Sequence, residues 1–293
     1  MWQCSYGRIA HFANVLDVFE EEAVPYPDLP VSVKTDLASM SMREHHHMWH
    51  LARNPDFWNS LTPQEKADLT AQGWNAPRFH GTSGSGLDFL GMHRNMIPHV
   101  NHLMAQAGDP SWPSVVAWMP IPWSESDADW PMPPSWPGMH PSMGEAKSPA
   151  SVSDNQQAVA QLTDPAVLKQ VSLDALGRYI EGTIHAWMHN RWSAQPVADV
   201  WAPEPENDYL GAPFSSHVNK HFWKLHGWID ERIRDWERAN DRQADLSDAW
   251  SGPSMHTLQP MAEALGARVR AAKAFIFAVD RRALTELLAI PRG

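Results

Sequence analysis

The chain has 293 residues, of which 43% are hydrophobic and 19% charged, a composition typical of a soluble globular protein that can build one large domain. Its formal net charge of -11 argues against binding to nucleic acid or to an anionic membrane, because both attract basic surfaces. A single cysteine, Cys4, excludes an internal disulfide framework, and no apolar run is long enough to cross a membrane. We therefore expect a cytoplasmic protein.

Helical periodicity dominates the sequence and strand signals are scarce, which predicts a mainly α fold in a single domain, residues 1–293. A first helix is predicted over 36–53 and contains a histidine-rich run. Thr62-Pro63-Gln64-Glu65 is a capping box with Pro at the first helical position, so a second helix should begin at about residue 63. The next helix is predicted over 86–107, after a Gly/Ser loop.

Pro, Trp, Met and Ser dominate residues 109–150, a composition that cannot sustain a helix. We expect an irregular segment that covers the domain, because its aromatic side chains need burial. Beyond this segment, Ser172 is expected to cap a helix over 173–192. Two further helices are predicted over 214–239 and 258–289.

Histidine occurs 16 times, and its spacing points to metal binding. His46 and His50 are four residues apart, as are His185 and His189. At about 100° per residue, such positions differ by roughly 40° around the helix axis, so the side chains of each pair point the same way. A lone pair of this kind is as often an ordinary surface or core feature, but two pairs, each beside a helix with another histidine, favour a metal site.

A third ligand for the first pair is predicted at His93, which shares a face of its helix with Leu87, Leu90 and other apolar residues. Histidines elsewhere on that helix lie about 120° and 180° away from His93, so they are expected at the surface. These are His99 and His102.

A third ligand for the second pair is predicted at His226, which shares a face with Phe222 and Ile229. On the same predicted helix His217 and His221 lie about 180° and 140° away, so one helix cannot direct all three histidines at one ion. The predicted metal ligands are thus His46, His50 and His93 for one ion and His185, His189 and His226 for the other.

The residues around these histidines exclude two common classes of metal protein. Neither pair encloses a carboxylate, so the H-E-x-x-H motif of zinc hydrolases is absent. Diiron bundles use Glu-x-x-His with several carboxylates, whereas these runs are nearly free of carboxylates. Sites of three imidazoles suit copper or zinc, and two adjacent sites favour a pair of copper ions.

In four segments the sequence resembles the type 3 copper proteins (the tyrosinase and arthropod haemocyanin–phenoloxidase superfamily). The run His45-His46-His47-Met48-Trp49-His50-Leu51 is similar to the His-His-Trp-His-Trp-His-Leu run of the first copper site in that branch, and Met92-His93 is similar to its third ligand. His185-Ala186-Trp187-Met188-His189 is similar to the helical pair of the second site, and 222–230 is similar to a Phe-Phe-Arg-x-His-x-x-Ile-Asp segment. The resemblance covers 36–107 and 173–240, the expected core.

The resemblance implies an antiparallel four-helix core with two copper ions between the helices and dioxygen as a ligand. It implies an oxidase or monooxygenase that acts on a small phenol or aminophenol. The alternatives are a reversible oxygen carrier like haemocyanin and a copper- or zinc-binding protein without turnover. Single-domain size favours an enzyme.

Two residues bear on the reaction that the resemblance implies. Tyrosinases often have Asn after the first histidine of the second site, where it helps a Glu to hold a water that deprotonates phenols, and this chain has Ala186. Glu181, four residues before His185, occupies a position where some phenoloxidases carry a catalytic acid, although it could equally be a solvated helix residue. We therefore expect oxidation of an o-diphenol or o-aminophenol to exceed hydroxylation of a monophenol.

Three further features remain open in the sequence. His80 is an alternative ligand of the first ion, on the tyrosinase pattern of a histidine upstream of a His-Arg pair. Met and His residues at 132–143 could deliver copper, by themselves or with a delivery partner, or could simply pack. Asp230 is expected either to support the site from beside His226 or to pair with Arg234.

Overall fold

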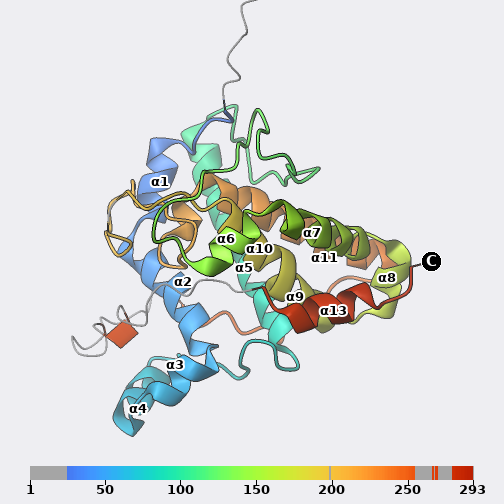
Figure 1. Cartoon of the computed structure of the whole chain (residues 1–293). Coiled ribbons are helices and arrows are strands. Elements are labelled where there is room, and N and C mark those ends of the chain that lie inside the picture. The colour runs from blue at the N-terminus through green and yellow to red at the C-terminus, as the bar shows by residue number, and fades with distance from the viewer. Residues whose placement is uncertain (1–24, 198, 255–265, 267, 270–278, 293) are drawn as a thin grey trace, which may run out of the picture.

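The computed structural model describes residues 25–197, 199–254, 266, 268–269 and 279–292. Over these residues the chain is mainly helical and contains no strand, which confirms that the fold is mainly α. None of the helices in the described ranges combines the length and the apolar character needed to cross a membrane. Figure 1 shows the helices gathered into one body, with α3 and α4 extending from one end.

The helices before the irregular segment are α1 (Val31–Leu37), α2 (Met40–Ala52), α3 (Pro55–Ser60), α4 (Pro63–Ala71) and α5 (Ser85–Ala107). The helix predicted over 36–53 is α2 alone, because Ser39 takes an extended conformation and separates it from α1. The capping box predicted at Thr62 and Glu65 is present, with the Thr62 side chain accepting from Glu65 N and the Glu65 side chain accepting from Thr62 N.

The segment after α5 is irregular from residue 109 to residue 140 and lies over the core, as expected. Its buried side chains are Trp112, Trp118, Ile121, Pro122 and Trp130. The end of the prediction is wrong, since α6 (Pro141–Ala146) and α7 (Pro149–Leu162) begin within 109–150. In both helices Pro stands at the start, where it has no hydrogen bond to lose, and the preceding residue caps the helix.

A single continuous run of helix carries His185 and His189. It consists of α9 (Leu173–Ile180), a π-helical stretch η1 (Glu181–His185) and α10 (Ala186–Arg191), and α8 (Pro165–Gln170) precedes it. Ser172 caps α9 as predicted, with its side chain accepting from Ala175 N. Single π turns inside α-helices are frequent at functional sites.

The last part of the described chain differs from the prediction at its start. Asn219 caps α11 (Lys220–Asn240), so the helix predicted from residue 214 begins six residues later. His217 instead lies on a separate 3-10 turn, η2 (Ser216–Val218). Of the helix predicted over 258–289, the structure describes α13 (Arg281–Leu288), and most of the remainder lies outside the described residues.

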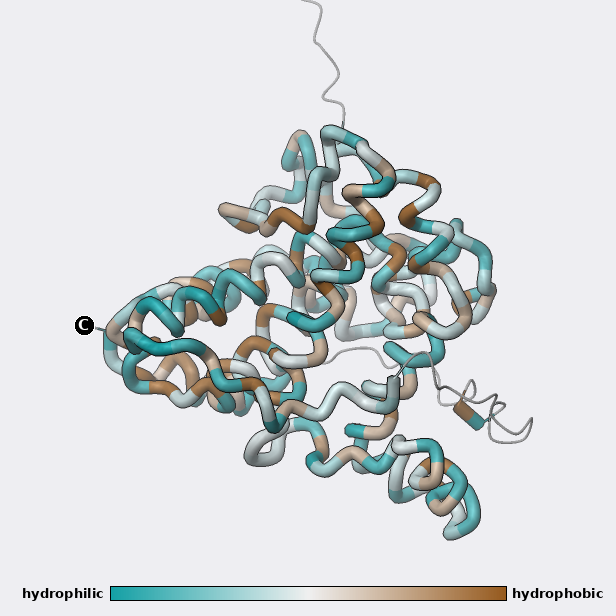
Figure 2. The backbone as a smooth tube through the Cα atoms, turned by 180° about the vertical axis from the view of Figure 1, so that it is seen from behind, coloured by the Kyte–Doolittle hydropathy of each residue, from teal (hydrophilic) through white to brown (hydrophobic). Residues whose placement is uncertain are grey.

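Two glycines allow the helices of the core to approach closely. A Cβ atom on Gly177 of α9 would lie 2.2 Å from the carbonyl oxygen of Gly86 in α5, and one on Gly86 would lie 2.0 Å from Asp174 O. The backbones of α5 and α9 therefore touch, which only glycine permits. Helices α5 and α11 also pack together, and Figure 2 shows hydrophobic and hydrophilic residues alternating along the helices, as expected for amphipathic elements.

Candidate metal centre

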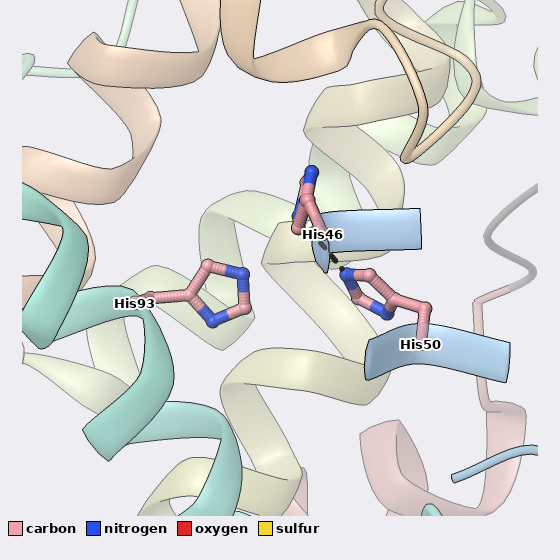
Figure 3. A group of neighbouring side chains, drawn as sticks. All are labelled: His46, His50 and His93. Atoms are coloured by element: carbon pink, nitrogen blue, oxygen red, sulfur yellow. Dashed lines mark hydrogen bonds between the residues drawn. The ribbon is translucent and has the colours of Figure 1, made fainter. Parts of the chain in front are cut away.

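All six predicted ligands lie together in the interior of the protein. Each has an exposed fraction of 5% or less. They come from four helical segments: α2 contributes His46 and His50, α5 contributes His93, η1 and α10 contribute His185 and His189, and α11 contributes His226. Figure 3 shows His93 directed from α5 toward the two histidines of α2.

Two groups of histidine nitrogens have the separations of ligands on a metal ion. The first group is His46, His50 and His93, and the second is His93, His185 and His226. Within each group the ligand atoms lie within 4.8 Å of one another. His93 belongs to both groups, so the histidines form one continuous cluster.

The predicted second set differs in one member from the second group. His189 lies beside this group, with its ring centroid 4.6 Å from that of His185 and 5.9 Å from that of His226. His93 is stacked on His226, with ring centroids 4.5 Å apart. The sequence could assign His93 to one ion only, whereas the structure places it between the two groups.

The two histidines of α2 have a spacing that fits one ion. His46 Nε2 and His50 Nε2 are 3.3 Å apart. Two nitrogens bound about 2.0–2.1 Å from one ion at a tetrahedral angle lie about 3.3 Å from each other. The pair of residues four positions apart thus converges as the helix geometry predicted.

Backbone carbonyls determine which nitrogen several histidines present to the cluster. His93 Nδ1 donates to Phe89 O at 2.8 Å and His226 Nδ1 donates to Phe222 O at 2.7 Å. Because a carbonyl only accepts, Nε2 of each ring carries the lone pair. Both Nε2 atoms are buried without a hydrogen-bond partner in the described part of the chain. Buried nitrogens left in this way are costly, and a metal ion would satisfy them.

His46 is oriented by a residue that the sequence analysis did not select. His217 Nε2 donates to Leu37 O at 3.0 Å, so its Nδ1 is an acceptor. That Nδ1 lies 3.2 Å from His46 Nδ1, which therefore donates and leaves Nε2 to face His50. His217 is fully buried. The signal that was missed is Asn219. As the N-cap it starts α11 after His217, so this residue lies outside the helix and can turn toward α2.

Aromatic side chains exclude water from the cluster. Phe222 stacks on His226 at a centroid distance of 3.7 Å, Phe89 lies 4.6 Å from His93, and Trp49 lies 4.9 Å from His50. Burial lowers the pKa of His93 to about 4. The other predicted ligands also have a lowered pKa, for the same main reason. The imidazoles are therefore neutral at pH 7, the state that binds metals.

Glu181 lies at the edge of the cluster in a buried ion pair with Arg53. Arg53 donates to its two carboxylate oxygens at 2.7 Å and 3.0 Å, and stacks over the ring of Trp49 at 4.1 Å. Burial by itself would raise the pKa of Glu181, but the positive charge of Arg53 more than offsets this, and the pKa is lowered. Glu181 is thus a charged carboxylate whose oxygens are engaged by Arg53.

His80, the alternative ligand, lies outside both histidine groups. It is half-buried, and its Nε2 is 3.9 Å from Glu181 Oε2. His99 and His102 are exposed, as predicted. Ala186 is buried and has no polar side-chain atom that could hold a water.

Asp230 forms the ion pair with Arg234 that was one of the two predicted alternatives, and it also pairs with Arg94. Its carboxylate accepts from Arg94 Nε at 2.6 Å and lies 2.7 Å from Arg234. Arg94 follows His93 on α5, and Asp230 follows His226 by one turn on α11. The ion pair therefore joins the two helices whose histidines stack on each other.

A cavity of about 290 Å³ reaches the cluster at His46. Its walls are formed by α2, α5 and residues 251–254. The lining residues are Met42, His45, His46, Met92, Asn95, Met96, His99, Ser251, Gly252, Pro253 and Ser254. These residues include no Asp, Glu, Lys or Arg, so the wall that the described residues form is weakly polar and free of carboxylates, Lys and Arg.

The donor set fits copper or zinc better than a hard cation. Neither group contains a carboxylate, and all the donors are neutral nitrogens. Comparison with known proteins adds no assignment, since no protein-family model matches the chain and no curated protein matches it significantly. The metal-site hypothesis depends on the residues and on their geometry.

Proposed function

We propose that the chain is a dicopper oxidase of the type 3 class that uses dioxygen to oxidise a small phenolic or aminophenolic molecule. The proposal rests on one observation: two groups of three buried, neutral histidines share His93. Within each group the ligand atoms lie within 4.8 Å of one another. On this proposal α2, α5, α9 to α10 and α11 are the antiparallel four-helix core that houses the metals.

The proposed ligands of one ion are His46, His50 and His93, and those of the other are His185, His189 and His226. Support comes from the contacts that orient the rings. Carbonyls accept from Nδ1 of three of these histidines, and His217 accepts from a fourth, so each presents Nε2. Copper, when bound, would supply the redox chemistry that reduces dioxygen with electrons from the substrate.

The protein around the metals would exclude water and position the substrate. The rings of Trp49, Phe89 and Phe222 seal the histidines from solvent, which keeps the imidazoles neutral. The cavity at His46 gives an aromatic molecule access to the cluster. Its uncharged lining favours a neutral substrate over one with a carboxylate, which would lose hydration without gaining an ion pair.

Oxidation of an o-diphenol or o-aminophenol is the reaction that these residues support best. Such a substrate gives up two electrons and two protons from its own polar groups. Hydroxylation of a monophenol additionally needs a positioned base. Ala186 cannot hold a water, and Glu181 already accepts two hydrogen bonds from Arg53, which lowers its basicity.

Metal analysis of two variants on the same helix tests the metal site. The wild-type chain and His99→Ala, which changes an exposed histidine of α5, should each bind two copper ions. On the proposed ligand sets His93→Ala should lose the ion bound with His46 and His50. It should also weaken binding of the second ion, because a ligand atom of His93 lies within 4.8 Å of those of His185 and His226. One ion per wild-type chain, or full loading of His93→Ala, would contradict the proposal.

Initial rates on matched catechol, o-aminophenol and phenol test the reaction. We expect the phenol rate to be lower by on the order of 10²-fold, since a missing catalytic element can cost this much. Ala186→Asn should raise the phenol rate selectively. Equal wild-type rates on phenol and catechol would refute the proposed preference.

A further inference from the structure

We infer that the methionines of the cavity at His46 form an uptake site for cuprous copper, which passes along them to the histidine cluster. The inference rests on the proposed function, because it concerns how that copper enters. The residues that carry it are Met42, Met92 and Met96, together with His45 and His99.

The methionines converge on the cavity from two helices. Met92 and Met96 are four residues apart on α5, and Met42 and His46 are four residues apart on α2. Residues with this spacing lie on the same helix face. All four line the same 290 Å³ cavity, so thioethers from α5 and α2 border the space that ends at a predicted metal ligand.

Burial increases along each of the two helices toward the cluster, from His99 to Met92 on α5 and from Met42 to His46 on α2. His99 is exposed and Met96 is half-buried, one turn apart on α5. Met92 is 2% exposed, Met42 is 7% exposed and His46 is 1% exposed. The donors therefore form a series from the protein surface to a cluster that is itself almost closed to solvent.

A series of neutral donors solves a physical problem for a buried metal site. An ion that leaves water without replacement ligands pays a large desolvation penalty. Thioether and imidazole donors replace water for the soft cuprous ion, whereas Zn²⁺ gains little from thioethers. None of the described residues that line the cavity is a carboxylate, so hard cations find no charged ligand among them. Transfer is an exchange of ligands, in which copper stays cuprous and no electron moves.

The same side chains could serve only as packing, since Met42 and Met92 belong to the hydrophobic core. Met→Leu separates the two roles, because it keeps the volume of the side chain and removes its sulfur. Met132 and Met139 offer a matched control. Both are half-buried methionines of the irregular segment, where the sequence alone would also allow copper delivery, and neither lines the cavity.

The main experiment follows copper transfer from a coloured cuprous chelate to the metal-free full-length chain. Met92→Leu/Met96→Leu should load at least about tenfold more slowly than the wild type and reach the same final copper content. Met132→Leu/Met139→Leu should load at the wild-type rate, and Zn²⁺ should load equally fast into all three proteins. Wild-type cuprous loading by the cavity variant would overturn the inference.

X-ray absorption of the wild-type chain saturated with copper and then given one further equivalent of cuprous ion gives a second test that needs no variant, because the histidine cluster is already filled. Sulfur scattering from bound copper is expected, and scattering from nitrogen alone would refute the uptake site. A different result would contradict the proposed function. A chain that shows sulfur scattering but neither binds two copper ions nor oxidises catechol would retain the methionine site and lose the oxidase.

Discussion

Replacing Gly177 with Ala should separate α5 from α9 and weaken the metal site without touching a ligand. The added Cβ would lie 2.2 Å from Gly86 O and 2.6 Å from Gly86 C. These are backbone atoms, so no side chain can move aside. Ordinary contact between such atoms needs about 3.5 Å, and the helices must therefore shift by about 1 Å.

The expected cost follows from two opposing effects. Overpacking of this kind costs about 1–3 kcal/mol, and the clash with backbone places Gly177→Ala at the upper end. Helix propensity offsets up to about 1 kcal/mol of this loss in the free energy of unfolding, because Ala stabilises a helix interior relative to Gly. We expect a net loss of about 2 kcal/mol in the free energy of unfolding.

Gly144→Ala is the matched control. Gly144 also lies in a helix, α6, but its Cβ would meet only Met139 Cε at 3.5 Å, an ordinary contact. This variant should be as stable as the wild type or slightly more stable. Urea unfolding of the metal-free proteins, followed by tryptophan fluorescence, measures both changes.

The shift between α5 and α9 should also lower the copper affinity of the metal site. His93 lies on α5, and His185 is the last residue of η1, in the helical run that begins with α9. The ring centroids of the two histidines are 5.5 Å apart. A shift of about 1 Å can lower a catalytic rate by on the order of 10²-fold. Equal stability and equal copper affinity of the two Gly→Ala variants would show that contact between the backbones does not position the histidines.

Three further outcomes are expected. Glu181→Gln leaves the buried Arg53 charge uncompensated and should destabilise the protein by about 3–5 kcal/mol in urea unfolding. The double variant Arg53→Met/Glu181→Leu should recover most of this loss, and equal stability of the two variants would contradict the expected cost of the uncompensated charge. His217→Phe removes the acceptor of His46 Nδ1 and should weaken copper binding by about 10–100-fold in a competition titration, and unchanged affinity would exclude this role. The metal-free protein should lose stability as the pH falls from about 6.5 toward 4, because imidazoles of the unfolded chain take up protons while buried ones such as His93, with its lowered pKa, stay neutral. Each such histidine lowers the free energy of unfolding by up to about 1.4 kcal/mol per pH unit. Unfolding curves that coincide at about pH 7 and pH 5 would refute this.

Features that depend on neighbours along the chain could be read from the sequence. The capping box at Thr62 and the cap at Ser172 are present because the side chain and the backbone group that it binds are three residues apart. The convergence of His46 and His50 follows in the same way from the helical repeat. The prediction of an irregular segment as far as residue 150 failed because proline was treated only as a helix breaker, whereas at the first position it starts a helix.

Features that depend on contact between helices needed the tertiary structure. Nothing in the spacing of the histidines shows that His93 faces both groups or that His217 orients His46. The pairing of Arg53 with Glu181 joins residues 128 positions apart. Helical periodicity specifies the direction of a side chain around its own axis, but not the distance or angle at which two axes cross. In this protein that distance is set by the contact between Gly86 and Gly177, because two backbones can touch only where neither carries a side chain.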